Sequence, residues 1–210
     1  MKRFFIPFVF IAFILLSCGG AKELKTGNVY TDPVYNFSVP CPNGWRHFVY
    51  NGETRLRTVY TEYTRSKERS EVLKMDAGIE IDPHIYIKVI TGNKDVKQYV
   101  DNLKKNYITE FFNLFSKDVY TTSKTITKEE VTTILGTQEA YSFEIKESHI
   151  NPQQRNPITQ VYGFEVDTII NFTIFKRGEN IYHIEFICPA IAMKENLKKY
   201  QDLINSLSFK

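Results

Sequence analysis

Metal and thiol chemistry in this 210-residue sequence depends on four histidines and three cysteines. The histidines are His47, His84, His149 and His183. A zinc site needs ligands at short, paired spacings such as His-x-x-x-His, and these four are isolated from one another. His183 stands between Tyr182 and Ile184 in an apolar run, so we expect it on the less apolar face of a strand, exposed or half-buried. No metal site is predicted.

Catalytic signatures of other kinds are also missing from the sequence. It contains no Gly-x-Ser-x-Gly nucleophile elbow and no glycine-rich phosphate loop. Asp76, Glu80 and Asp82 crowd one segment but lack the spacing of a calcium-binding loop, so we interpret the segment as a turn with solvated acids. We therefore predict no catalytic residue, no cofactor and no enzymatic activity.

Cys18 has the most specific surroundings of the three cysteines. Lys2 and Arg3 precede an apolar run from Phe4 to Leu16, which is typical of a secretion signal. The run has about 13 residues, whereas a membrane-spanning helix needs roughly 20. It ends in Leu15-Leu16-Ser17-Cys18 followed by Gly19, and this sequence resembles the lipobox of bacterial lipoproteins.

The lipobox resemblance implies that the thiol of Cys18 receives a diacylglycerol and that residues 1–17 are removed. Two or three acyl chains on the new N-terminus would anchor the protein stably in a membrane. The polar residues 18–29 would then form a flexible tether. By the sorting rule known for lipoproteins of some Gram-negative envelopes, glycine rather than aspartate after the cysteine favours the outer membrane, on its periplasmic or surface face, over the inner membrane.

The other two cysteines, Cys41 and Cys188, each end an apolar run and precede a proline. In an oxidising cell envelope an even number of remaining cysteines indicates a disulfide. Two buried free thiols are the alternative, because free cysteine is among the most buried residue types. Both alternatives remain open from the sequence.

The charge balance argues against a nucleic-acid partner. Removal of Lys2 and Arg3 with the signal leaves 25 basic residues against 24 acidic ones, without a basic footprint. The basic-looking stretch from Arg55 to Arg69 also contains glutamates, so we interpret it as a solvated face. The 42% hydrophobic content argues against disorder, and residues 30–210 are enough for a single domain with a sizeable core.

Hydrophobic periodicity predicts strands with two helices inserted among them. A helix should begin at an Asn93 N-cap and continue through Tyr107 or beyond, and a closing helix should span residues 192–206. A tight turn at residues 176–179 should join two strands in a hairpin, and residues 151–157 should form a polar loop. The strands are expected at 34–40, 77–81, 85–90, 120–126, 130–135, 139–147, 160–175 and 180–188. This order predicts an α+β fold with an antiparallel sheet.

Both ends of this predicted domain resemble the PsbP-like family. Tyr35-Asn36-Phe37-Ser38-Val39-Pro40, followed by Pro42-Asn43-Gly44-Trp45, is similar to the family's opening motif. The closing segment from Tyr200 to Phe209 is similar to its terminal helix and short strand. The resemblance implies an antiparallel sheet sandwiched by helices (α/β/α) and a role as a binding or assembly subunit. It supplies no catalytic motif.

Aromatic residues are plentiful, with 13 tyrosines and 16 phenylalanines. Exposed tyrosine is typical of protein interfaces. The candidates for an aromatic interface are Tyr60, Tyr63, Tyr107, Phe111 and Phe112. The alternative is that these side chains belong to the core.

Two functions follow as expectations. The first is a membrane-anchored cell-envelope lipoprotein that binds an envelope protein or complex and is not an enzyme. The second is a module that binds a small or apolar ligand on its sheet face. A protein partner found by pull-down would favour the first function, and a small molecule retained in a native mass spectrum would favour the second.

Overall fold

The computed structural model describes residues 22–24, 29–50, 56–61, 83–107, 121–155 and 162–210. In these residues the strands before α3 are β1 (Lys22–Leu24), β2 (Val29–Thr31), β3 (Phe37–Pro40), β4 (Arg46–Val49), β5 (Leu56–Thr61) and β6 (His84–Ile90). The helix α3 (Val96–Asn106) precedes β7 (Thr121–Ile134), β8 (Gln138–Arg155), β9 (Tyr162–Arg177) and β10 (Asn180–Pro189). The chain closes with the short 3-10 helix η1 (Ala190–Ala192), α5 (Met193–Ser206) and β11 (Ser208–Phe209).

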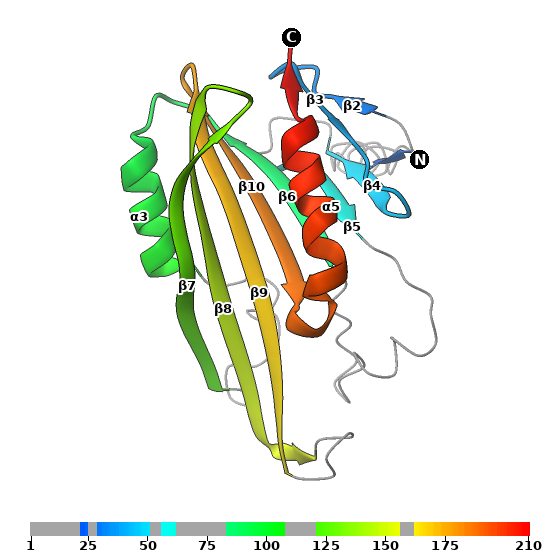
Figure 1. Ribbon diagram of the computed structural model, residues 1–210, viewed down its shortest axis with the longest axis vertical. Coiled ribbons are helices and arrows are strands. Elements are labelled where there is room, and N and C mark those ends of the chain that lie inside the picture. The colour runs from blue at the N-terminus through cyan, green and yellow to red at the C-terminus, as the bar shows by residue number, and fades with distance from the viewer. Residues whose placement is uncertain (1–21, 25–28, 51–55, 62–82, 108–120, 156–161) are drawn as a thin grey trace, which may run out of the picture.

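Eight strands form one antiparallel sheet in the order β1-β4-β5-β6-β10-β9-β8-β7 (Figure 1). A smaller sheet has the order β11-β3-β2, so it joins the end of the chain to its beginning. β8 and β9 extend well past the two helices as a long hairpin (Figure 1). The predicted hairpin between β9 and β10 is confirmed, with Arg177 paired to Asn180.

The two faces of the large sheet are covered by different elements, as β10 shows. Tyr182, Ile184 and Phe186 belong to a core that also contains the buried side chains of α5. Ile181 and Ile187 belong to a second core, against which α3 packs. Since side chains alternate along a strand, α3 and α5 lie on opposite faces of the sheet.

The predicted α+β class is confirmed, but the expected sandwich by helices is overstated. In the described part of the chain, α3 and α5 each cover only part of one face of an eight-stranded sheet (Figure 1). The small sheet contributes Phe37 and Val39 to the α5-side core. The described part of the chain is therefore mostly β, and strands of up to 18 residues extend beyond the helices that cover them.

Several element boundaries differ from the prediction. β7 is one strand with a β-bulge between Ile126 and Lys128, because one extra residue does not end a ladder. The expected loop at 151–157 is a strand as far as Arg155, held by pairing with β9. The N-cap of α3 is Asp95, whose carboxylate accepts from the Gln98 amide, and not Asn93. The expected strand at 77–81 lies outside the described residues.

Two N-terminal expectations also need correction. Within the predicted tether 18–29, β1 pairs with β4, because backbone pairing does not require apolar side chains. Within the predicted solvated stretch, Arg57 is buried on β5 and its Nε lies 2.7 Å from Asp32 Oδ2. Asp32 also accepts from the hydroxyl of Tyr30. This buried ion pair connects the chain next to the small sheet to the large sheet.

Candidate functional site

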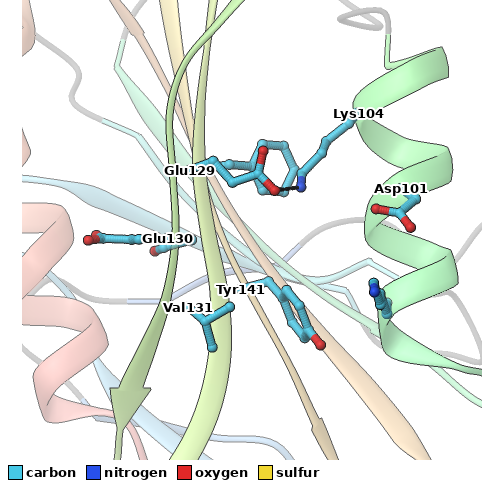
Figure 2. Close-up of a pocket in the computed structure, with 9 residues that line it drawn as sticks. Asp101, Lys104, Glu129, Glu130, Val131 and Tyr141 are labelled. Atoms are coloured by element: carbon cyan, nitrogen blue, oxygen red, sulfur yellow. Dashed lines mark hydrogen bonds and ion pairs between the residues drawn. The ribbon is translucent and has the colours of Figure 1, made fainter.

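The candidate site is a groove between α3 and the strands β7 and β8, with a volume of about 420 Å³. α3 contributes Lys97, Asp101 and Lys104 from one wall, and the strands contribute the floor and the other wall (Figure 2). The strand residues are Glu129, Glu130, Val131, Tyr141, Ser142 and Phe143. The groove therefore depends on how α3 is held against the sheet.

Two tyrosines attach α3 to the central strand β10. The hydroxyl of Tyr99 lies 2.8 Å from Nδ1 of His183, and the hydroxyl of Tyr107 donates to Glu185 Oε1 at 2.5 Å. Val100 is the one fully buried residue of the helix. Val96, Leu103 and the rings of the two tyrosines also pack, partly buried, against the same core. Apolar contact therefore holds the helix on the sheet, and the two directional hydrogen bonds fix its orientation.

The carboxylate of Glu185 is the centre of this buried polar cluster. Lys88 Nζ lies 2.9 Å from its Oε2, and His183 Nε2 lies 3.2 Å from the same oxygen. Burial alone would raise the pKa of Glu185, but His183, Lys88 and Tyr107 together hold it below its ordinary value. Burial lowers the pKa of His183 and raises that of Tyr107. Glu185 is therefore charged, while His183 and Tyr107 are neutral.

Two lysines connect α3 to β7. Lys104 forms an ion pair with Glu129, and its Nζ lies 5.4 Å from the centroid of the Phe143 ring (Figure 2). Lys124 donates to the backbone carbonyls of Lys104 and Tyr107, at 2.8 and 3.1 Å. A cation at these carbonyls also complements the negative end of the helix dipole.

At the open side of the groove, Tyr141 is half-buried and Val131 is 61% exposed. Slight burial and the nearby carboxylates of Glu139 and Asp95 raise the pKa of Tyr141, so its hydroxyl stays protonated. The lining contains no histidine or cysteine, and the described residues contain no group of side chains that could hold a metal ion. The groove is equipped for binding by charge and aromatic contact.

The predicted aromatic interface is partly wrong. Tyr60 is fully buried and stacks on His47 with ring centroids 4.3 Å apart, because β5 is an internal strand whose side chains are covered. Tyr107 is half-buried and bonds to Glu185 from the end of α3. The remaining candidates, Tyr63, Phe111 and Phe112, lie outside the described residues, as does the predicted lipidation site Cys18.

Cys41 and Cys188 are both buried free thiols in the structure, and both belong to the α5-side core. The Sγ of Cys41 donates to the carbonyl of Trp45 at 3.3 Å, and that of Cys188 donates to the carbonyl of Pro189 at 3.4 Å. In the structure both cysteines are therefore reduced, and both lie on the α5 side of the large sheet. A disulfide between them in the exported protein stays a prediction.

The exposed or half-buried position predicted for His183 is wrong. It does lie on the less apolar face, but α3 covers that face and leaves the side chain 3% exposed. The groove residues were missed altogether. Lys97, Asp101 and Lys104 recur at helical spacing, which indicates one common face. Only tertiary packing shows which strands lie opposite that face.

These features define an α+β protein with a charged groove between one helix and the edge of an antiparallel sheet. In sequence, no family model and no curated protein matches it. In structure, it is similar to the cyanobacterial PsbP protein (CyanoP) of Synechocystis sp. PCC 6803, with a TM-score of 0.54 and 11% identity. The match covers 92% of this chain and 98% of that one. The predicted PsbP-like resemblance is therefore confirmed for the fold alone.

Two other solved structures are similar at lower scores. LpqN of Mycobacterium tuberculosis, described as involved in cell envelope biogenesis, has a TM-score of 0.43 and 9% identity, covering 100% of this chain and 99% of that one. The Ran-binding protein Mog1p of Saccharomyces cerevisiae has a TM-score of 0.43 and 11% identity, and the match covers 90% of this chain and 95% of that one. No helix in the described part of the chain could cross a membrane by its length and apolar character.

Proposed function

We propose that this protein is a cell-envelope lipoprotein, anchored through lipid on Cys18, that binds a protein partner and is not an enzyme. The observation that supports binding is the groove between α3 and β7–β8. Its opening presents a phenol and an exposed valine beside charged side chains from two elements. The lipobox supports the anchor, and outer-membrane placement is part of the same proposal.

The lining of the groove favours a protein partner over a small apolar ligand. The volume of about 420 Å³ lies within the range of ligand pockets. Such pockets are mostly apolar, however, and five of the nine lining residues here are charged, of which Glu130 has its side chain on the α5 face of the sheet. An aromatic side chain surrounded by charged groups is typical of protein interfaces, where a tyrosine contributes area and the rim remains polar.

Site-specific photo-crosslinking in intact cells tests the proposed function. A photoreactive amino acid at Lys97, in the groove, should give a discrete adduct of one protein mass. The control is the same amino acid at Lys198 on α5, whose side chain is 78% exposed on the other face of the sheet. Tyr141→Ala should weaken the Lys97 adduct at least several-fold, because it removes the aromatic contact.

Two results would reject the protein-binding function. One is an equal set of adducts from Lys97 and Lys198, because random collision would then explain both. The other is no adduct from Lys97 together with a small molecule retained by the purified protein in a native mass spectrum. That second result would support the alternative function of small-ligand binding.

A further inference from the structure

Strand β7 forms one edge of the large sheet and, in the described part of the chain, pairs only with β8. Its side chains from Ser123 to Val131 are all exposed. An unpaired edge of this length is a template for another strand. The bulge between Ile126 and Lys128, together with the lysines on the strand, opposes pairing in most registers. Only a register that accommodates both features can be stable.

One register accommodates the bulge. Ile126 lies opposite Ile145 of β8, and Val131 lies opposite Tyr141. Both β8 residues face α3, so Ile126 and Val131 do too. Residues five positions apart in a regular strand would point to opposite faces. The extra residue Thr127 makes this separation equivalent to four. If two copies of β7 pair antiparallel about a two-fold axis at Glu129, Ile126 of each copy lies directly opposite Val131 of the other.

The two residues that meet in this register are the exposed large apolar side chains of β7. Ile126 is 40% exposed and Val131 is 61% exposed. Cross-strand pairs of β-branched side chains have Cβ atoms about 5 Å apart and stabilise a sheet. The register therefore covers two apolar residues of each copy that the isolated chain exposes to solvent.

The charges of β7 are complementary to themselves in the same register. Lys128 and Glu130 lie opposite Glu144 and Ser142 of β8, so both point to the α5 face, and Glu130 points away from α3 (Figure 2). Each Lys128 would oppose Glu130 of the other copy. Lys128 is 70% exposed, and its ion pair with Glu144 is long, with 3.9 Å between Nζ and Oε2. Glu130 has no ion-pair partner among the described residues. The two Glu129 carboxylates meet at the axis, where each is neutralised by Lys104 of its own copy.

We propose that a second copy of this chain pairs with β7, giving a two-fold symmetric dimer with one continuous sheet of sixteen strands, twice the eight of one copy. Opposed side chains in an antiparallel pair point to the same face, so both α3 helices lie on one face of the joined sheet. The two grooves then open toward each other across the axis. In the dimer Val131 lies against Ile126 of the other copy, so the groove would offer a bound partner Tyr141 and its charged side chains, whatever that partner is.

Sedimentation equilibrium of the full chain in detergent tests the dimer. The micelles must outnumber the protein chains, so that two chains do not share a micelle by chance. Wild type should have the mass of two chains. Lys128→Glu should raise the dissociation constant at least about tenfold, because two attractive pairs become repulsive. Val131→Lys should do the same. The double variant Lys128→Glu with Glu130→Lys should restore the wild-type constant, because it reverses both charges of each pair.

The matched control is Lys198→Glu, the same charge change on α5, which should leave the dimer intact. Circular dichroism of each variant separates loss of pairing from loss of folding. A monomeric wild type would overturn the proposal. So would a dimer that tolerates Lys128→Glu and Val131→Lys, or a double variant that folds and stays monomeric.

Discussion

His47 is a fully buried histidine on β4, with its ring stacked on Tyr60 and Nε2 placed 2.5 Å from the hydroxyl of Thr58. Burial lowers the pKa of His47 from 6.5 to about 4. An imidazole in this environment can hydrogen-bond and stack while neutral, but no carboxylate in the described part of the chain pairs with the ring to compensate a charge. At the scale of residues, this ring therefore makes the stability of the fold sensitive to acid.

We predict that the free energy of unfolding falls between pH 6.5 and about 4 because of His47. The folded pKa is below the unfolded value, so in this window the unfolded chain binds a proton that the folded protein does not. The loss over the full window is about 3 kcal/mol, and above pH 6.5 this residue has no effect. Urea unfolding at a series of pH values measures it.

The control for this pH prediction is His47→Gln, which cannot titrate but can bond to Thr58. Its stability should depend less on pH within the same window. A further loss at lower pH is expected in both proteins, because the pKa of Asp32 is held below 3.8 against the effect of burial by Arg57. That contribution is present above pH 3.8 and disappears below it. Identical pH slopes for the two proteins would contradict the role of His47.

The proposed lipid anchor on Cys18 is a second property of a single residue, and its prediction depends on the sequence. Cys18→Ala should leave an uncleaved or mislocalised precursor that takes up no radiolabelled palmitate. The reason is that the thiol is the acceptor of the lipid in a lipobox. Palmitate labelling equal to that of wild type would reject the assignment.

At the scale of elements, α3 is the part of the site that depends most on a few polar contacts. Its hydrogen bonds from Tyr99 and Tyr107 are made to side chains of β10. β10 itself is paired on both sides, by β6 and β9. The sheet is therefore the rigid part of the site, and the helix is the part whose position can be changed by single substitutions.

We predict that Tyr107→Phe destabilises the protein by about 1–3 kcal/mol, because the buried carboxylate of Glu185 loses a donor. Amide hydrogens of α3 should then exchange faster, while those of β9 and β10 should change only with global stability. Lys105→Gln is the control, since this residue is exposed on the same helix. Unchanged exchange in α3 of the Tyr107→Phe protein would show that other contacts hold the helix.

At the scale of the whole molecule, the α5-side core joins the beginning of the chain to its end. Phe37 of β3 lies 6.2 Å from Tyr182 of β10 and 6.5 Å from Phe209 of β11, measured between ring centroids. Cys41 and Cys188 belong to this same core. The two cysteines therefore lie on one side of the sheet, as a disulfide between them requires.

We predict that natively exported protein contains a disulfide between Cys41 and Cys188. The cell envelope proposed as its location is oxidising, and closure of so long a loop would stabilise the fold by roughly 4 to 5 kcal/mol in the chain-entropy model. Mass spectrometry without reductant should show a mass two hydrogens below that of the reduced protein and a linked pair of cysteine peptides. Two freely alkylated thiols in unfolded, unreduced protein would reject the disulfide.

The sequence alone was enough to predict the local elements. The periodic stripe predicted α3, and the polar turn between two β-branched runs predicted the hairpin of β9 and β10. These predictions succeeded because helix stripes and turns depend on residues close together in the chain. The lipobox prediction for Cys18 has the same local basis and awaits its experiment.

Tertiary structure alone decided which side chains are buried and which of them form a site. Tyr60 was expected at an interface and is covered, because its strand lies inside the sheet. In the sequence, Glu185 is one polar residue in an alternating strand. The structure shows that α3 covers it and that Lys88 and Tyr107 bond to its carboxylate. The groove exists because Lys104 and Glu129 meet from a helix and a strand, and such a contact depends on topology, which periodicity does not encode.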